Sequence, residues 1–442
     1  MAISGKRMYS MLEKLGFVRL STFDGEKKGA EIISEEIKAI TGNEPKIEKF
    51  MAPRYEIKKV KFEITEPFCK EIEATGYGFS GNAAKDGLEA DFKYIEGFDD
   101  IDLADVKGKI VLIAGGVGYS SYEKLVKVGV AGFVCTCGTF LDKDEETDMD
   151  ERMLRAKHLE AGQIPGVCIK IKDALELVPM HPTKAKITLE QEEGEAESQN
   201  IVYDVVGEKY PEEVVVYTAH YDSVVFSEGY FDNSSGSAML LELLRHYTEN
   251  APKRTVRFIW CGSEERGLLG SKAYIAAHEA ELEKIRLCIN IDMAGPILGR
   301  DAAVVTGEES LCHALTYLYK ELGYPMSVNQ DIYSSDSIPF ADKGIPGVNF
   351  MRRAAAGSSQ IHCRHDVISI LSGESLERTA NFVATFSDKV VNAAFFPIDK
   401  KVPDNIVEKV DKYLMKKKGF FMKRNIKCWS YLIKKILTRF MP

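Results

Sequence analysis

Five side chains of the kinds that bind zinc follow predicted strands in the second half of this 442-residue chain. They are two histidines and three carboxylates, namely His220, Asp232, Glu265, Asp292 and His362. Zn²⁺ accepts imidazole nitrogen and carboxylate oxygen at about 2.0 to 2.2 Å, and a catalytic site keeps one position open for water. Two ions can share these five ligands if Asp232 bridges them. The sequence therefore predicts a hydrolase with two zinc ions per chain.

A sixth carboxylate, Glu264, lies directly before Glu265. Two adjacent ions polarise a carbonyl group and make a water molecule acidic enough to attack it near neutral pH. A base within hydrogen-bond reach of that water can take its proton and pass it to the leaving amine. Glu264 is the predicted base, and Glu265 is the predicted ligand.

Each candidate residue also has a structural alternative. Asp232 precedes Asn-Ser-Ser, so it could be only the N-cap of the helix that follows. His365 competes with His362 for the last ligand position, and Cys363 between them could bind zinc, although a thiolate suits a structural site better. The remaining histidines are interpreted as structural or surface residues: His158, His181, His246, His278 and His313.

The predicted elements should bring the candidate ligands together. From 199 to 395 strands and helices alternate: 213–218 and 255–261 are apolar runs typical of buried strands, and 237–247 has the apolar spacing of a helix. This alternation predicts a three-layer α/β/α fold, with helices on both faces of a mostly parallel, mixed central sheet. Such sheets bind ligands outside the carboxyl ends of their strands, where His220, Glu265 and Asp292 are expected.

The other segments differ in composition from this α/β part. Residues 1–62, with a helical pattern at 29–40 and strand-like runs after it, are predicted to begin the catalytic domain, and 199–395 to form its main part. Residues 63–198 are Gly-rich, contain short β-like runs and one amphipathic helix, and hold no candidate ligand. The glycines within 115–118 lack the spacing of a phosphate-binding loop and are interpreted as a turn. Residues 396–442 are a basic, amphipathic tail.

Five short motifs occur in order along the chain. They are His-x-Asp at 220–222, Asp-Asn at 232–233, Glu-Glu at 264–265, Asp-Met at 292–293, and His362 followed by Asp366. Together they resemble the co-catalytic two-zinc aminopeptidases, relatives of aminopeptidase Y and glutamate carboxypeptidase. The resemblance implies that Glu264 is the base, that Asp222 orients His220, and that the bond between residues 232 and 233 is cis. It also implies that 63–198 is an inserted, small, β-rich protease-associated domain that walls the cleft.

Two positions depart from the pattern of that family. The residue before the last ligand, often aromatic in the family, is Ile361, and Ser335-Asp-Ser337 replaces the Ser-Asp-His of many relatives. The group that would stabilise the oxyanion is therefore not predicted, whereas the set of metal ligands is complete.

The substrate class follows from the charge of the site. An acidic metal site suits a protonated or metal-bound terminal amine, so we predict an aminopeptidase that acts on peptides with a free N-terminus. A carboxypeptidase or dipeptidase of the same family is the nearest alternative, and it would need cations for the terminal carboxylate, for which Arg352, Arg353 and Arg364 are candidates. A glutaminyl cyclase would not need all five ligands. A non-catalytic binding module on the same fold is a further alternative, which the complete residue set disfavours.

The composition is that of a globular protein, with 45% hydrophobic and 28% charged residues. Nine scattered cysteines without a CxxC pair predict neither a disulfide framework nor a zinc finger. The first residues contain no apolar run of signal-peptide length, so a cytoplasmic location is expected. A net charge of −9 argues against nucleic acid as a partner.

The positive charge is concentrated at the end of the chain. From residue 400 onward there are 13 Lys/Arg and 3 Asp/Glu, interleaved with Trp, Phe, Leu and Ile. Such a tail could form a weak contact with a membrane surface or a partner protein. The structural alternative is a terminal helix docked on the acidic body. The sequence leaves the oligomeric state unknown.

Overall fold

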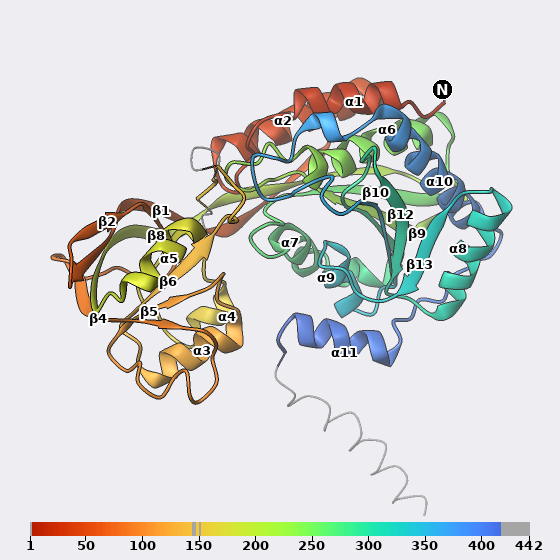
Figure 1. Cartoon of the computed structure of the whole chain (residues 1–442). Helices are drawn as coiled ribbons and strands as arrows, with labels where there is room; N and C mark the ends of the chain where they lie inside the picture. Colours follow the sequence, from red (N-terminus) through yellow and green to blue (C-terminus); the bar gives the residue numbers. More distant parts are fainter. Residues whose placement is uncertain (1, 144–146, 150–151, 417–442) are drawn as a thin grey trace, which may run out of the picture.

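Two lobes make up the described part of this computed structural model, which covers residues 2–143, 147–149 and 152–416 (Figure 1). The larger lobe, on the right of the figure, contains the main sheet with α1, α2 and α6 to α11. The smaller lobe, on the left, contains β2 to β7 with α3 to α5. Two long strands, β1 (Lys46–Glu66) and β8 (Lys184–Val205), belong to both lobes.

A mixed sheet forms the centre of the larger lobe. Its strand order is β13-β12-β14-β11-β9-β10-β8. The central strands β10, β9, β11 and β14 are mutually parallel, whereas β8 runs antiparallel to β10 and β12 runs antiparallel to β14. Helices bury both faces of the central strands, which accounts for their continuous apolar runs. The bounds are β9 (Tyr210–His220), β10 (Arg254–Cys261), β11 (Ile285–Ile291), β12 (Gly299–Val305), β13 (Met326–Gln330) and β14 (Gly347–Ala354).

Helices cover the two faces of this sheet, as the alternating pattern predicts. One layer consists of α1 (Gly5–Lys14), α2 (Asp24–Thr41), α6 (Ser235–Glu249) and α10 (Gly373–Val391), which pack against one another. The other layer consists of α7 (Leu269–Ala277), α9 (Ser337–Asp342) and α11 (Asp404–Tyr413). The remaining helix, α8 (Glu309–Glu321), packs beside β13. The three-layer α/β/α prediction is thereby confirmed.

The smaller lobe is built on a short parallel sheet of β4 to β7 that continues from β8. Its strands are β2 (Lys70–Ile72), β3 (Ala74–Gly76), β4 (Leu88–Ile95), β5 (Ile110–Ile113), β6 (Gly132–Cys137) and β7 (Gly166–Lys170). Its α-helices are α3 (Tyr119–Val128), α4 (Ala156–Leu159) and α5 (Ile171–Leu177), so the described residues of this lobe form three α-helices where the sequence pattern predicts one.

Two features of the fold differ from the sequence prediction. The first helix is α1, not the pattern at 29–40, which forms the later part of α2. The side chain of Ser4 caps α1, and Met8, Met11 and Leu12 bury its apolar face, but the surrounding polar residues hide this short pattern. The predicted boundaries at 62 and 198 fall inside β1 and β8, so both strands continue through them.

Within the described residues, no helix is long and apolar enough to span a membrane. Helix α11 docks on α9 through a small apolar cluster that includes Ile338, Ile406 and Val410. The part of the basic tail with the Trp, Phe and Leu pattern lies outside the described residues.

Candidate active site

Three neighbouring strands deliver candidate residues at their carboxyl ends. Strand β9 lies between β10 and β11 and is parallel to both. His220 is the last residue of β9, Asp292 follows β11 directly, and Glu264 and Glu265 follow β10 after a short turn. Parallel strands end at the same edge of the sheet, so this convergence is the one that the sequence predicts.

Asp232 lies between the two candidate histidines. Its Oδ1 is 3.1 Å from Nε2 of His220, and its Oδ2 is 3.2 Å from Nε2 of His362. Two groups of possible metal ligands therefore share this carboxylate: His220, Asp232 and Asp292 form one, and Asp232, Glu265 and His362 form the other. Within each group the ligand atoms lie within 4.8 Å of one another. In the described part of the chain, His365 and Cys363 join neither group.

Asp232 reaches this place through an irregular turn, not at a strand end. The turn Tyr230–Ser234 leads into α6, and the bond from Asp232 to Asn233 is cis, as the resemblance implies. The carboxylate of Asp366 accepts hydrogen bonds from the N–H of Asp232, at 3.0 Å, and from that of the preceding residue, at 2.7 Å. The N-cap of α6 is Ser234, so the interpretation of Asp232 as a simple helix cap is wrong.

The backbone beside three of the loops is left-handed at residues other than glycine. Ser263 has a φ of 55°, Met293 of 63° and His362 of 59°. Such conformations cost free energy and persist where surrounding contacts hold them, often at functional sites. Here Ser263 and Met293 are neighbours in sequence of Glu264 and Asp292, and His362 is itself a candidate ligand.

Asp222 connects two of the loops. Its Oδ1 lies 3.5 Å from Nδ1 of His220, and its two carboxylate oxygens accept the N–H groups of Glu264, at 3.0 Å, and Glu265, at 3.1 Å. Asp222 therefore contacts the His220 ring and also holds the backbone of the Glu-Glu pair. The second contact goes beyond the role that the resemblance implies.

The donor set fits a pair of divalent metal ions. Both groups offer only imidazole nitrogen and carboxylate oxygen, the ligands that Zn²⁺ binds in catalytic sites. One oxygen of Glu265, Oε1, is buried and has no hydrogen-bond partner. A buried polar atom without a partner is costly, and a metal ion would satisfy it.

The charges of the site perturb both histidines strongly. Burial would lower the pKa of His220, but Glu264 and the hydrogen-bonded Asp222 and Asp232 raise it well above its ordinary value. Burial also opposes the charged form of His362, yet the contacts with Asp232 and Glu265 raise its pKa to about 11. Without metal, the neighbouring carboxylates therefore favour the charged form of both rings. A metal ion would take the place of those protons.

Three carboxylates of the site, those of Glu264, Glu265 and Asp292, have raised pKa values. Burial, with the charges of neighbouring Glu265 and Asp292, raises the pKa of Glu264 well above its usual range. Burial and the charge of Asp232 likewise raise the pKa of Glu265 and of Asp292. A cluster of buried carboxylates with raised pKa values in one cleft is typical of a catalytic site.

Two buried residues of the N-terminal segment support these loops, and sequence reasoning missed both. Arg19 is fully buried and donates to the carbonyls of Tyr221, at 2.5 Å, and Gly229, at 3.1 Å, on either side of the loop between His220 and Asp232. Glu26 accepts both the N–H and the hydroxyl of Ser263, at 2.9 and 3.0 Å. Burial and the charge of Asp222 raise the pKa of Glu26 to about 7.

Tyr333 is a third residue that the sequence did not indicate. Burial and then the charges of Asp292, Asp232 and Glu264 raise its pKa above its ordinary value. Its hydroxyl lies 4.0 Å from Sδ of Met293, the residue after Asp292. A protonated phenol therefore stands near the ligand groups, in a loop with no periodic pattern that could have revealed it.

The positions that depart from the family pattern do not offer a comparable donor. Ile361 is partly exposed, and the Ser337 hydroxyl pairs with that of Ser335 at 2.9 Å. Two of the arginines considered for a terminal carboxylate are already engaged. Arg352 pairs with buried Asp301 at 2.8 Å, and Arg364 pairs with Asp148 of the smaller lobe at 2.5 Å.

A hollow of about 80 Å³ opens beside the ligand groups. Its wall includes Glu265, Leu20 and Val224 from the larger lobe, and Tyr55 and Met153 from β1 and the smaller lobe. The smaller lobe therefore contributes to the surface next to the candidate metal site.

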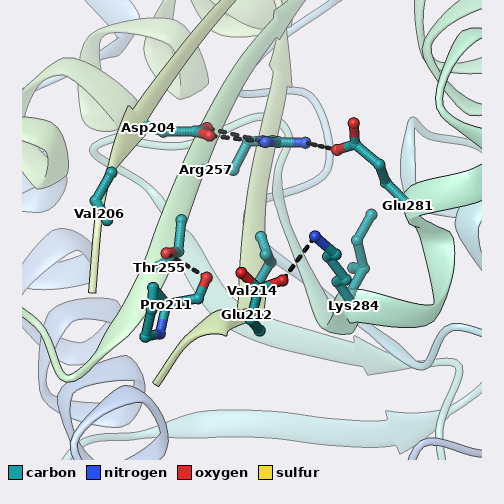
Figure 2. Close-up of a pocket in the computed structure, with 10 residues that line it drawn as sticks. Asp204, Val206, Pro211, Glu212, Val214, Thr255, Arg257, Glu281 and Lys284 are labelled. Carbon is teal, nitrogen blue, oxygen red and sulfur yellow. Dashed lines mark hydrogen bonds and ion pairs between the residues drawn. The ribbon is translucent and has the colours of Figure 1, made fainter. Parts of the chain in front are cut away.

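A larger hollow, of about 220 Å³, lies elsewhere on the sheet (Figure 2). An ion-pair chain from Asp204 through Arg257 to Glu281 crosses it. It includes Val214, whereas His220 ends the same strand, so the two places are roughly 20 Å apart at 3.3 Å per residue. This hollow has no candidate ligand and is not part of the site.

Residues 200–387, which contain all five ligand candidates, match the sequence profile of Peptidase family M28. This part of the chain is therefore similar to that family. Aminopeptidase YwaD of Bacillus subtilis is 27% identical over 406 residues, which cover 86% of this chain and 83% of that protein. Carboxypeptidase Q of Bos taurus is 24% identical over 424 residues, which cover 88% and 86% of the two chains.

The fold of the chain also matches a solved structure over nearly its full length. A zinc aminopeptidase from Bacillus subtilis superposes with a TM-score of 0.74 at 24% identity, covering 91% of this chain and 99% of that chain. The chain is thus a metallopeptidase, and both an aminopeptidase and a carboxypeptidase are among the proteins that are similar to it.

Proposed function

We propose that this protein is a two-zinc aminopeptidase of M28 type that releases the N-terminal residue of peptides. The observation that carries the proposal is the position of Asp232, whose two oxygens face two different histidines at 3.1 and 3.2 Å. One carboxylate shared by two ligand groups is the arrangement that a bridged metal pair requires. His220 and Asp292 would complete one site, and Glu265 and His362 the other.

The zinc ions, when bound, would polarise the scissile carbonyl and acidify a water molecule. Glu264 would take the proton of that water and return it to the leaving nitrogen. Its raised pKa suits a group that must both accept and donate a proton near neutral pH. Asp222 would hold the backbone of Glu264 and orient His220, because its carboxylate contacts both.

The charge of the cleft supports an aminopeptidase over a carboxypeptidase. The ligand groups and Glu264 together present four carboxylates, which favour a protonated amine at the end of a substrate. Arg352 and Arg364 already pair with carboxylates, so neither supports recognition of a C-terminus. Residues 63–198 would act as a protease-associated insert whose Met153 helps to wall the cleft.

A carboxypeptidase is the second candidate, because carboxypeptidase Q is among the relatives that match most of this chain. The two activities can be separated with zinc-loaded protein and a peptide pool read by mass spectrometry. Each peptide is supplied with free ends, with an acetylated N-terminus and with an amidated C-terminus. An aminopeptidase shortens peptides from the N-terminus and is blocked by acetylation. Blocking by amidation alone would show a carboxypeptidase.

The role of Glu264 has its own test. Glu264→Gln should lower kcat by roughly 10² to 10⁴, because general acid–base catalysis contributes about that much. Zinc content, measured by mass spectrometry of the metal, should stay the same. Glu208→Gln, which changes an exposed glutamate on the turn before β9, is the matched control and should keep full activity. Full activity in Glu264→Gln would remove Glu264 from the mechanism.

A further inference from the structure

His362 is the most exposed of the five candidate ligands. Its side chain is 52% exposed, whereas those of the other four are at most 9% exposed. It lies in the stretch 355–367, which has no helix or strand and connects β14 to the short helix Ile368–Ile370. A half-exposed side chain on such a loop keeps its conformational freedom unless other contacts restrict it. The contacts of this loop therefore decide where His362 stands.

The smaller lobe makes one of these contacts, two residues after His362. Asp148 accepts two hydrogen bonds from Arg364: the backbone N–H donates to Oδ2 at 2.6 Å, and the side-chain Nε donates to Oδ1. Both carboxylate oxygens therefore hold one residue of the loop, through its backbone and through its side chain. The side chain of Asp148 is buried, and hydrogen bonds to an ionised group are stronger than neutral ones.

Asp148 is in turn fixed by the core of the smaller lobe. The next residue, Met149, is buried in the apolar cluster of that lobe. Its Sδ lies 3.8 Å from Sγ of Cys137 on β6. Asp148 therefore keeps its place with the sheet of the smaller lobe, and it transmits the position of that lobe to the loop of His362.

A second contact holds the same loop from the larger lobe. Asp366 accepts two N–H groups of the turn that carries Asp232. Between these anchors, Nε2 of His362 lies 3.2 Å from Oδ2 of Asp232 and 3.1 Å from Oε2 of Glu265. Loss of the contact with the smaller lobe would leave the loop fixed on one side only.

We infer that Asp148 is a positioning residue for His362, so that the smaller lobe completes the ligand group that contains His362. This inference rests on the proposed two-zinc function, and it names a residue outside the segment 200–387 that matches the family profile. The smaller lobe thereby does more than line the cleft, because its contact with the loop determines how tightly one of the two ions binds. The ligand group that contains His220 includes no residue of this loop.

Zinc titration of the metal-free protein, in competition with a chelator, tests this inference. Asp148→Ala removes both hydrogen bonds to Arg364. The ion of the His362 group should then bind roughly 10- to 100-fold more weakly, because loss of a residue that orients a metal ligand costs about this much affinity. The ion of the His220 group should keep its affinity. Asp105→Asn changes an exposed carboxylate of the same lobe that pairs only locally, with Lys109, and should leave both affinities unchanged.

A variant of the ligand itself shows whether Asp148 acts through His362. His362→Ala should bind one ion tightly, at the His220 group. In that background Asp148→Ala should not weaken zinc binding further, because the two residues support one interaction. A general loosening of the fold would instead weaken the remaining ion and lower the thermal midpoint in both backgrounds. The expected result is an effect of Asp148→Ala that exists only while His362 is present.

The failure of this inference can be told apart from the failure of the proposed function. Two ions bound with equal affinities by the unchanged protein and by Asp148→Ala would overturn the positioning role and leave the two-zinc proposal intact. A weaker remaining ion after Asp148→Ala in the His362→Ala background would overturn the positioning role as well. A single ion bound by the unchanged protein would overturn both the inference and the bridged metal pair.

Discussion

Tyr333 brings a hydroxyl group close to the candidate ligands at a point where the family pattern offers none. The surrounding carboxylates and burial raise its pKa, so the phenol stays protonated and can donate a hydrogen bond. Tyr333→Phe removes that donor and keeps the ring. If the hydroxyl stabilises negative charge that develops on the substrate, kcat should fall by roughly 10²-fold with little change in KM.

The measurement is steady-state kinetics on an N-terminal leucine amide, with the thermal midpoint as a control for folding. Tyr317→Phe is a suitable matched variant, because Tyr317 is 70% exposed on α8. An unchanged kcat in Tyr333→Phe would show that the hydroxyl group does not stabilise developing charge and that Tyr333 only lines the cleft.

At the scale of residues, the ligands could be predicted because they stand at strand ends in motifs of fixed spacing. The supporting residues could not. Glu26 contacts partners 172 and 237 residues away in the chain, and one of its contacts is a backbone N–H that no side-chain pattern encodes.

At the scale of elements, hydrogen bonds connect α2 to the loop that follows β10. Glu26 lies in the first turn of α2 and accepts hydrogen bonds from Ser198 on β8 and Ser263 in the loop. Its pKa is about 7 in the fold and near 4.5 when exposed, so the folded chain favours the protonated form. Between pH 4.5 and pH 7 the folded state therefore binds more protons than the unfolded state. Because of this difference, the free energy of unfolding falls as the pH rises through that range.

We expect this carboxyl to reduce the free energy of unfolding by roughly 3 kcal/mol between about pH 4.5 and pH 7.5. Glu26→Gln cannot titrate, so the metal-free variant should lose less thermal stability than the metal-free parent over that range. The comparison requires only thermal midpoints at several pH values. Parallel curves for the two proteins would show that Glu26 titrates alike in the folded and unfolded states.

The layers of the larger lobe were predictable because strand and helix patterns alternate there. The continuity of β1 and β8 was not, since their composition changes midway. Polar residues dominate the part of β1 and β8 in which the two strands pair only with each other. Apolar residues dominate the parts in which the strands are packed within a larger sheet. The domain boundaries predicted from composition therefore fall inside a continuous hydrogen-bonded ladder of β1 and β8.

At the scale of the whole molecule, the ligand groups bring the carboxylates of Asp232, Glu265 and Asp292 together at the carboxyl edge of the sheet. Metal ions that bind only the folded state stabilise it by mass action. Removal of metal with a chelator should therefore lower the thermal midpoint by several degrees, and added Zn²⁺ should restore it until about two ions per chain are bound.

Scanning calorimetry with metal analysis tests this expectation. Ca²⁺ prefers more oxygen ligands and should not restore the midpoint. Asp232→Asn weakens the shared ligand and should bind fewer than two ions per chain. Saturation of the unchanged protein at one ion per chain would contradict the bridged pair.

The paired strands β1 and β8 connect the two lobes, and the number of residue pairs between them sets how far apart the lobes lie. Both crossings into the smaller lobe are made by one antiparallel ladder, which runs from Lys46 opposite Val202 to Glu66 opposite Lys184. Each residue pair adds about 3.4 Å, and the alternation of side chains tolerates changes only in steps of two. Loss of two matched pairs would draw the smaller lobe, with Met153, roughly 7 Å along the ladder, away from its present place beside Glu265, without altering one ligand. The length of this ladder, counted in residues, therefore sets the place of the smaller lobe beside the cleft independently of the metal ligands.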